Sequence, residues 1–162
     1  MDTAEETKSV EPYINIARRA DIFSPKEIKI IKDLLIDCRS SVDGDYVIID
    51  EKQGSQLVGF AVIGRIEWTR FSWDLYWVIV DKKHQRQGIG QKLLKRVEEF
   101  LLKTAQHTVV VAEISSNREY APAAAFFSNA GFSKAGILPD YFSKGDSLIT
   151  YYKEVKKSQL QL

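Results

Sequence analysis

The chain has very little of several residue types on which other protein classes depend. It contains one cysteine, Cys38, which rules out an intramolecular disulfide and fits a reducing compartment. Its two histidines, His84 and His107, are scattered and form no metal-ligand pattern with that cysteine. No apolar run approaches the length of a membrane span, and the first ten residues are polar and acidic rather than an export signal. We therefore expect a cytoplasmic protein that binds neither a metal nor a membrane.

A strong net charge is also missing. The 23 Lys and Arg residues balance 22 Asp and Glu residues, so the formal net charge is +1 and no basic field favours nucleic acid as a partner. The 162 residues, 44% of them hydrophobic, suffice for one domain with a buried core. We predict a single domain over residues 1–162, with loose polar tails at Met1–Val10 and Lys156–Leu162.

Hydrophobic periodicity predicts a mixture of strands and helices. Tyr13–Arg18 alternates as a strand would, whereas Ser24-Pro25-Lys26-Glu27 carries the signals of a helix start, with the helix running to about Cys38. Further helices are expected after Gly90 and over Pro122–Ala130. Further strands are expected at Tyr46–Asp50, Leu57–Glu67, Leu75–Val80, Thr108–Ile114, Phe132–Leu138 and Leu148–Val155. This order predicts an α/β (α+β) domain with a mixed sheet flanked by helices.

The most informative stretch is Leu75–Leu102. An apolar strand ends at Asp81, a basic loop with Gly88 and Gly90 follows, and an amphipathic helix begins. Such a turn leaves N–H groups without partners at the positive end of the helix dipole, which makes a site for an anion and above all for phosphate. A Walker loop would place lysine directly after Gly90, and a dinucleotide fingerprint would need a third glycine at Leu93, so both are disfavoured. An ordinary glycine turn is the remaining alternative.

The pattern Gln85-x-x-Gly88-x-Gly90 after a strand resembles the acyl-CoA loop of the GNAT superfamily of acyl-CoA-dependent N-acetyltransferases. Phe126–Phe132 is similar to the family's F-Y-x-x-x-G-F segment, and Glu113–Asn117 is similar to the end of its fifth strand. The resemblance implies an enzyme that moves an acetyl group from acetyl-CoA, its cosubstrate, directly to a primary amine in a ternary complex.

The same resemblance implies where acetyl-CoA binds. In this family the mostly antiparallel sheet splays between its fourth and fifth strands, here Leu75–Val80 and Thr108–Ile114. Main-chain groups of the splayed strand then bind the pantetheine arm and polarise the thioester, while the glycine loop holds the diphosphate with added charge from Arg86 and Lys92. The cofactor-binding residues expected on this basis are Val78, Ile79, Val80, Gln85, Arg86, Gln87, Gly88, Ile89, Gly90, Gln91, Lys92, Asn117 and Phe127.

The catalytic candidates are less clearly marked. Asp74 opens the strand on which several family members place a catalytic glutamate, and Glu113 lies in an apolar strand, so either carboxylate could serve as the base. Each could also be a structural residue. The tyrosine that usually acts as the acid is Phe127 here and has no proton to give, which leaves Tyr120 and Tyr141 as candidates, or water.

The acceptor cannot be read from the pattern. We expect a small-molecule amine or amino acid, because no strong acidic patch for a basic peptide is evident. A protein N-terminus or lysine is the alternative acceptor, and a CoA-binding sensor that has lost catalysis is an alternative function that Phe127 would support. Many relatives pair through their C-terminal strands, so a homodimer is also an expectation.

Overall fold

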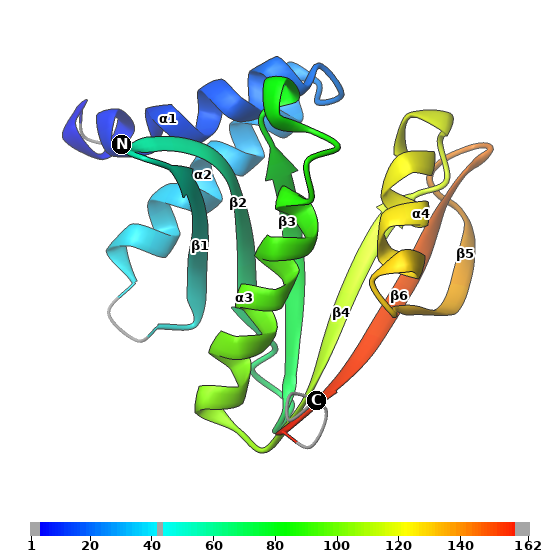
Figure 1. Ribbon diagram of the computed structural model, residues 1–162. Coiled ribbons are helices and arrows are strands. Elements are labelled where there is room, and N and C mark those ends of the chain that lie inside the picture. The colour runs from blue at the N-terminus through cyan, green and yellow to red at the C-terminus, as the bar shows by residue number, and fades with distance from the viewer. Residues whose placement is uncertain (1–3, 42–43, 158–162) are drawn as a thin grey trace. The chain divides into compact units, whose positions relative to one another are not determined.

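The computed structural model describes residues 4–41 and 44–157, which fall into two compact units (Figure 1). The first unit is drawn from Met1–Gly64 and Trp77–Val97, and the second from Arg65–Tyr76 and Glu98–Leu162. Among the helices in the described ranges, none is long and apolar enough to cross a membrane.

The elements follow one another in an order close to the predicted one. They are α1 (Ala4–Ala20), α2 (Pro25–Ser40), β1 (Tyr46–Gln53), β2 (Gln56–Arg65), β3 (Ser72–Val80), the short 3₁₀ turn η1 (Lys82–His84), α3 (Ile89–Thr104), β4 (His107–Ser115), the 3₁₀ turn η2 (Arg118–Tyr120), α4 (Ala121–Asn129), β5 (Ser133–Ser143) and β6 (Asp146–Lys156). The strand order in the sheet is β1-β2-β3-β4-β6-β5. Pairs β1/β2, β4/β6 and β5/β6 are antiparallel and β3/β4 is parallel, which confirms the mixed, mostly antiparallel sheet.

The N-terminal segment differs from the prediction. Ala4–Ala20 is a helix, so the predicted strand at Tyr13–Arg18 is wrong, and Ala4–Val10 is helical rather than a loose tail. The buried residues Val10, Tyr13, Ile14 and Ala17 are spaced at three and four residues, which is the period of a helix face. At the other end, Lys156 is still part of β6. Residues 1–3 and 158–162 of the predicted tails lie outside the described residues.

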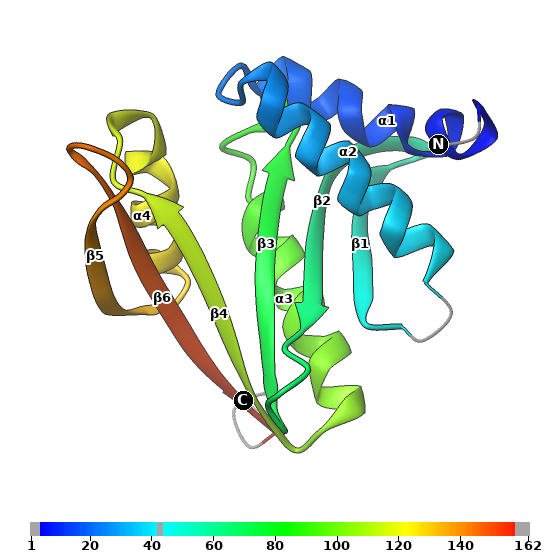
Figure 2. The same cartoon turned by 180° about the vertical axis from the view of Figure 1, so that it is seen from behind.

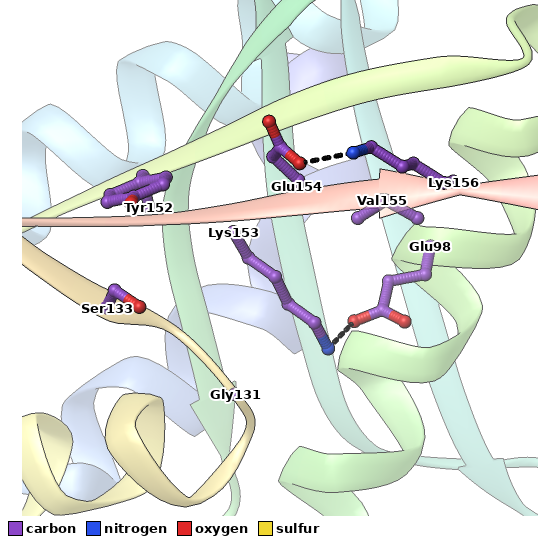
Figure 3. A pocket seen from close by; sticks show the side chains of 8 residues that line it. All are labelled: Glu98, Gly131, Ser133, Tyr152, Lys153, Glu154, Val155 and Lys156. Carbon is purple, nitrogen blue, oxygen red and sulfur yellow. Dashed lines mark hydrogen bonds and ion pairs between the residues drawn. The ribbon is translucent and has the colours of Figure 1, made fainter. Parts of the chain in front are cut away.

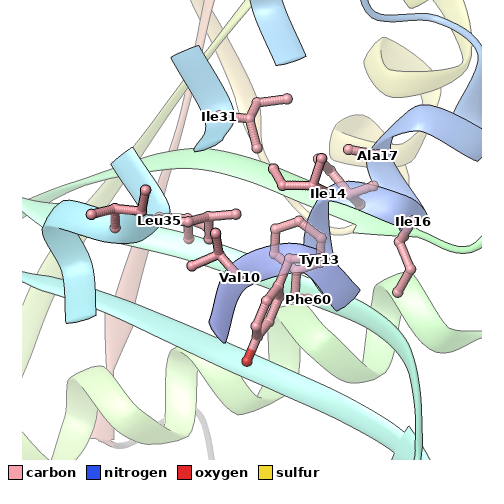
Figure 4. Packing of buried hydrophobic residues seen from close by; sticks show 11 residues of the cluster. Val10, Tyr13, Ile14, Ile16, Ala17, Ile31, Leu35 and Phe60 are labelled. Atoms are coloured by element: carbon pink, nitrogen blue, oxygen red, sulfur yellow. The ribbon is translucent and has the colours of Figure 1, made fainter. Parts of the chain in front are cut away.

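In the first unit, α1 and α2 pack on the strands through one apolar cluster (Figure 4). Ser24 caps α2 as predicted, because its hydroxyl accepts from Glu27 N–H and the Glu27 carboxylate accepts from Ser24 N–H. Tyr13 of α1 meets Phe60 of β2 edge to face, with ring centroids 5.1 Å apart. Figures 1 and 2 show α1 and α2 on one face of β1 and β2, and the start of α3 on the other.

In the second unit, α4 packs on the β5–β6 hairpin. The ring of Phe127 lies 5.1 Å from that of Phe132 and stacks on Tyr151 with centroids 6.0 Å apart. Gly131 follows the C-cap of α4 with φ at +85°, the left-handed conformation that glycine readily adopts after a helix end.

Pairing between β3 and β4 is brief. It covers only Ser72, Trp73 and Asp74, opposite Val109, Val110 and Val111. Beyond Asp74, no described residue of β3 is paired with β4. This short ladder agrees with the predicted splay between these two strands.

Candidate functional site

The glycine turn before α3 has the geometry of an anion cradle. Gly88 has φ at +78°, and a Cβ built on it would meet nothing within 4 Å, so the space in front of the backbone is open. The first intrahelical bond runs from Lys92 N–H to the Gly88 carbonyl, at 3.0 Å. The N–H groups of Ile89, Gly90 and Gln91 therefore precede the bonded part of the helix and have no intrahelical partner. A diphosphate fits these donors and the positive helix end behind them.

The start of α3 is held against β2 by Gly59. A Cβ at Gly59 would lie 3.1 Å from the Ile79 carbonyl oxygen, 3.2 Å from Ile89 Cγ2 and 3.2 Å from Leu93 Cδ1. Only a residue without a side chain allows helix and strand to approach this closely. The N-terminus of α3 is thereby fixed to the sheet at the end where the glycine turn lies.

The two predicted cationic side chains of the turn have different surroundings. Lys92 Nζ lies 3.0 Å from Oε1 of Glu51, a buried carboxylate of β1 that also pairs with Arg96. The ammonium of Lys92 is thus engaged within the protein, in a cluster of two cations around one carboxylate. Arg86 is exposed, adopts φ at +61°, and forms no ion pair or hydrogen bond with any residue that the structure describes. Arg86 is therefore the cation of the turn that remains available for a phosphate, in a backbone conformation that a non-glycine residue rarely adopts.

The three predicted residues of β3 do not present equivalent main-chain groups. The Ile79 carbonyl oxygen faces Gly59 and hence β2. Because successive peptide groups of a strand point to opposite edges, the main-chain groups of Val78 and Val80 point to the other edge. The Val80 carbonyl there accepts a hydrogen bond of 3.3 Å from Gln85 Nε2. Val78 is consequently the best placed of the three to meet an extended ligand.

Asp74 is half-buried at the start of β3. Burial raises the pKa of this carboxyl above its usual 3.8, and no other group contributes to the shift. Asp74 is paired in register with Val111 of β4, so its side chain leaves the same face of the sheet as Val111 and, two residues further on, Glu113.

Glu113 is exposed, unlike the apolar residues that flank it. The alternation along β4 buries Thr108, Val110 and Ala112, and it turns Glu113 to the opposite face. Glu113 thus shares its face with Val109 and Val111, which are half-buried, and its carboxylate reaches water.

Asn117 is held by a network that the sequence did not reveal. Its amide Nδ2 donates to Asp146 Oδ2 at 3.0 Å, and Ser115 Oγ donates to the other oxygen of the same carboxylate at 2.5 Å. Asp146 begins β6 and is buried. The side chain of Asn117 thus ties the end of β4 to β6, as a turn-forming residue would. No pattern in the sequence around Asp146, which directly follows Gly145, indicates that its carboxylate binds Asn117.

The aromatic candidates lie in unlike environments. Phe127 is buried in the aromatic cluster described above. Tyr120 ends η2, directly before α4, and is half-buried. Tyr141 of β5 is 58% exposed and packs edge to face on Phe142, with centroids 5.0 Å apart.

A pocket of about 690 Å³ opens in the second unit, and none of the predicted site residues is among its lining residues (Figure 3). Its lining residues are Glu98, Gly131, Ser133, Tyr152, Lys153, Glu154, Val155 and Lys156. Lys153 Nζ is bound to Glu98 Oε1 at 2.5 Å and to the Ala130 carbonyl at 2.9 Å. Since its central lysine is satisfied internally, this pocket offers less for binding than the glycine turn.

The chain is similar in sequence to a known protein family and to one of its curated members. A model of the acetyltransferase (GNAT) domain matches residues 43–134. The N-alpha-acetyltransferase RimI of Mycobacterium tuberculosis is 30% identical over 95 residues, which are 58% of this chain and 56% of that protein. The chain thus spans little more than half the length of this curated relative.

Solved structures share the fold. A GNAT-family protein from Desulfovibrio desulfuricans superposes with a TM-score of 0.84 and 27% identity, covering 91% of this chain and 93% of the other. An aminoglycoside 6'-N-acetyltransferase solved with coenzyme A has a TM-score of 0.67 and 12% identity, covering 91% of this chain and 90% of its own.

Proposed function

From the premise that the chain belongs to the GNAT acetyltransferase family, we propose that its acceptor is the α-amine at the N-terminus of a polypeptide. The coarser activity, acetyl-CoA-dependent N-acetyl transfer, follows from family membership. The single observation that supports cosubstrate binding is the open glycine turn at Gly88, in front of the unbonded N–H groups of α3. The polypeptide acceptor is supported by the similarity to RimI, whose name describes N-alpha acetylation.

The transfer proposed here is direct. The acceptor nitrogen attacks the thioester carbon, a C–N bond forms, the C–S bond breaks, and the CoA thiolate leaves and takes up a proton. The nitrogen must first lose a proton to become a nucleophile, and we assign that task to Asp74, whose raised pKa favours proton uptake more than an ordinary aspartate does. Cys38 is not used, because burial raises the pKa of its thiol to about 11 and keeps it protonated.

No acid among the described residues stands where the family's tyrosine usually does, and Tyr120 ends the η2 turn before α4 rather than lying at that position. Phe127 stands where the family commonly has tyrosine, and Tyr141 is turned to solvent on β5. We therefore propose that water protonates the thiolate, which is a good leaving group without assistance. The diphosphate is assigned to the turn at Gly88 and to Arg86, and the pantetheine arm to the main chain of Val78.

The acceptor is tested by offering acetyl-CoA with three matched sets of amines. One set contains peptides with a free N-terminus, the second contains the same peptides with a blocked N-terminus and one lysine, and the third contains aminoglycosides and small primary amines. Release of CoA thiol is measured, and the product is identified by mass spectrometry. We expect turnover only with the first set. Turnover with the third set alone would instead establish the small-molecule acceptor that the sequence favoured.

Two glycine variants separate cosubstrate binding from folding. Gly88→Glu fills the turn with a side chain and a negative charge, and we expect it to abolish CoA binding measured by titration calorimetry. Gly54→Glu is the matched control, because Gly54 also has a positive φ of +60° and open space around its Cβ, but lies in the β1–β2 turn. Equal CoA affinity in both folded variants would refute the assignment of the diphosphate to the turn.

A further inference from the structure

The segment that carries the glycine turn has almost no packing of its own. Between Asp81 and Ile89, which are both buried, the residues Lys82–Gly88 are exposed or half-buried. Apolar contacts therefore contribute little to its conformation, which depends on the residues at its two ends and on the hydrogen bond from Gln85 Nε2 to the Val80 carbonyl. Ile89 is packed against Gly59, as described above. The other end depends on Asp81.

Every polar main-chain and side-chain group of Asp81 has a partner. Its N–H donates to the Val58 carbonyl of β2 at 2.8 Å, and its carbonyl accepts from His84 N–H at 2.8 Å. One carboxylate oxygen accepts from Lys83 N–H at 3.2 Å, which caps η1. Asp81 thus sets both the end of β3 and the first turn of the segment that leads to Gly88.

The carboxylate of Asp81 is neutralised from a distant part of the chain. Arg19, in the last turn of α1, approaches it with two nitrogens, Nη2 to Oδ2 at 2.6 Å and Nε to Oδ1 at 3.4 Å. Asp81 is 2% exposed and Arg19 is 44% exposed, so the pair lies at the boundary of the core. Burial alone would raise the pKa of Asp81, but the hydrogen bonds and charge of Arg19, with Lys83 N–H and His84, hold that pKa below its usual 3.8.

We infer that Arg19 is a positioning residue for acetyl-CoA: its two-point contact with Asp81 holds the Lys82–Gly88 segment in the conformation that receives the diphosphate. This inference rests on the proposed function. Without Arg19, the buried carboxylate would lack a charged partner and would turn toward water, which would release the Lys83 N–H bond and with it the turn. CoA would then have to order the segment on binding, and the ordering would reduce its affinity.

The test compares neighbouring arginines of the same helix. Arg19→Gln removes the charge, and Arg19→Lys keeps the charge but loses the two-point geometry. Arg18→Gln is the control, since among the described residues the guanidinium of Arg18 pairs with Glu11 and Asn15 of its own helix, at the surface. We expect the Kd for CoA to rise by about tenfold or more in Arg19→Gln, to an intermediate value in Arg19→Lys, and by less than about twofold in Arg18→Gln. If Arg19→Gln does not fold, the lysine variant decides in its place.

A second ligand distinguishes positioning from general damage. S-acetylpantetheine carries the acetyl thioester but no diphosphate, and its Kd is measured by NMR at millimolar concentration. Positioning predicts that Arg19→Gln weakens CoA and leaves S-acetylpantetheine unchanged. Equal weakening of both ligands, or an unchanged Kd for CoA, would overturn the inference while leaving the proposed function in place. Failure of the wild-type protein to bind CoA would remove both.

Discussion

At the scale of single residues, the two candidate bases differ in their surroundings more than in their chemistry. Asp74 and Glu113 leave the same face of the β3–β4 pair, yet Asp74 is half-buried and Glu113 is exposed. Burial penalises the charged form, and this explains why the pKa of Asp74 is raised. A base that must take a proton near neutral pH benefits from that shift, so Asp74 is the stronger candidate.

The role of Asp74 predicts a defined pH dependence. A base acts in its deprotonated form, so kcat should fall as the pH is lowered through the pKa of Asp74. Because that pKa is raised, the decline in kcat should occur at a higher pH than it would for an aspartate with the usual pKa of 3.8. Asp74→Asn should lower kcat by roughly 10²–10⁴-fold and abolish this decline, whereas Glu113→Gln should leave both nearly unchanged. Steady-state rates over the widest pH range in which the protein stays folded would check this, and an unaltered profile in Asp74→Asn would assign the proton to solvent.

At the scale of elements, the sequence predicted helices and turns correctly where several capping or turn residues stand close together. The Ser24 capping box and the glycine turn at Gly88 both stand where the pattern predicted them. The failure is α1, where the short window Tyr13–Arg18 was interpreted as alternation. A window of six residues cannot distinguish the period of a strand from that of a helix, whereas the wider spacing of apolar residues from Val10 to Ala17 would have indicated a helix.

The close contact between α3 and β2 predicts that alanine at Gly59 destabilises the protein more than alanine at Gly136 does. Gly59→Ala would place a methyl group 3.1 Å from a backbone oxygen that cannot easily move, so we expect a loss of about 1–3 kcal/mol in the free energy of unfolding. Gly136→Ala on β5 meets nothing within 4 Å and should change that free energy by less than about 0.5 kcal/mol. Urea denaturation measures both. Similar losses at both sites would show that Gly59 is not a packing requirement.

At the scale of the whole molecule, the chain divides into two compact units, and the predicted residues are distributed over both. The first unit carries the glycine turn, Arg86 and the Arg19–Asp81 pair. The second carries Asp74, Glu113 and the Asn117–Asp146 network.

Binding of CoA should be visible in the stability of the whole protein. A ligand that binds only the folded state stabilises it by about 2.7 kcal/mol at one hundred times its Kd. For a chain of 162 residues this corresponds to a rise of roughly 5–10 °C in Tm, measured by differential scanning calorimetry. Gly88→Glu should show no rise, and Gly54→Glu should behave as the wild type. A wild-type Tm that does not respond to CoA would argue against a CoA site altogether.

The sequence by itself determined the features that depend on neighbouring residues: the strand, glycine turn and helix from Leu75 to Leu102, and the helix start at Ser24. Only the tertiary structure decided the partners of the charged and polar groups. Lys92 finds Glu51 across 41 residues of sequence, Asn117 finds Asp146 across 29, and Arg19 finds Asp81 across 62. Such pairs leave no local pattern, because a buried carboxylate requires a cation or donor near it in space and not at any fixed distance along the chain.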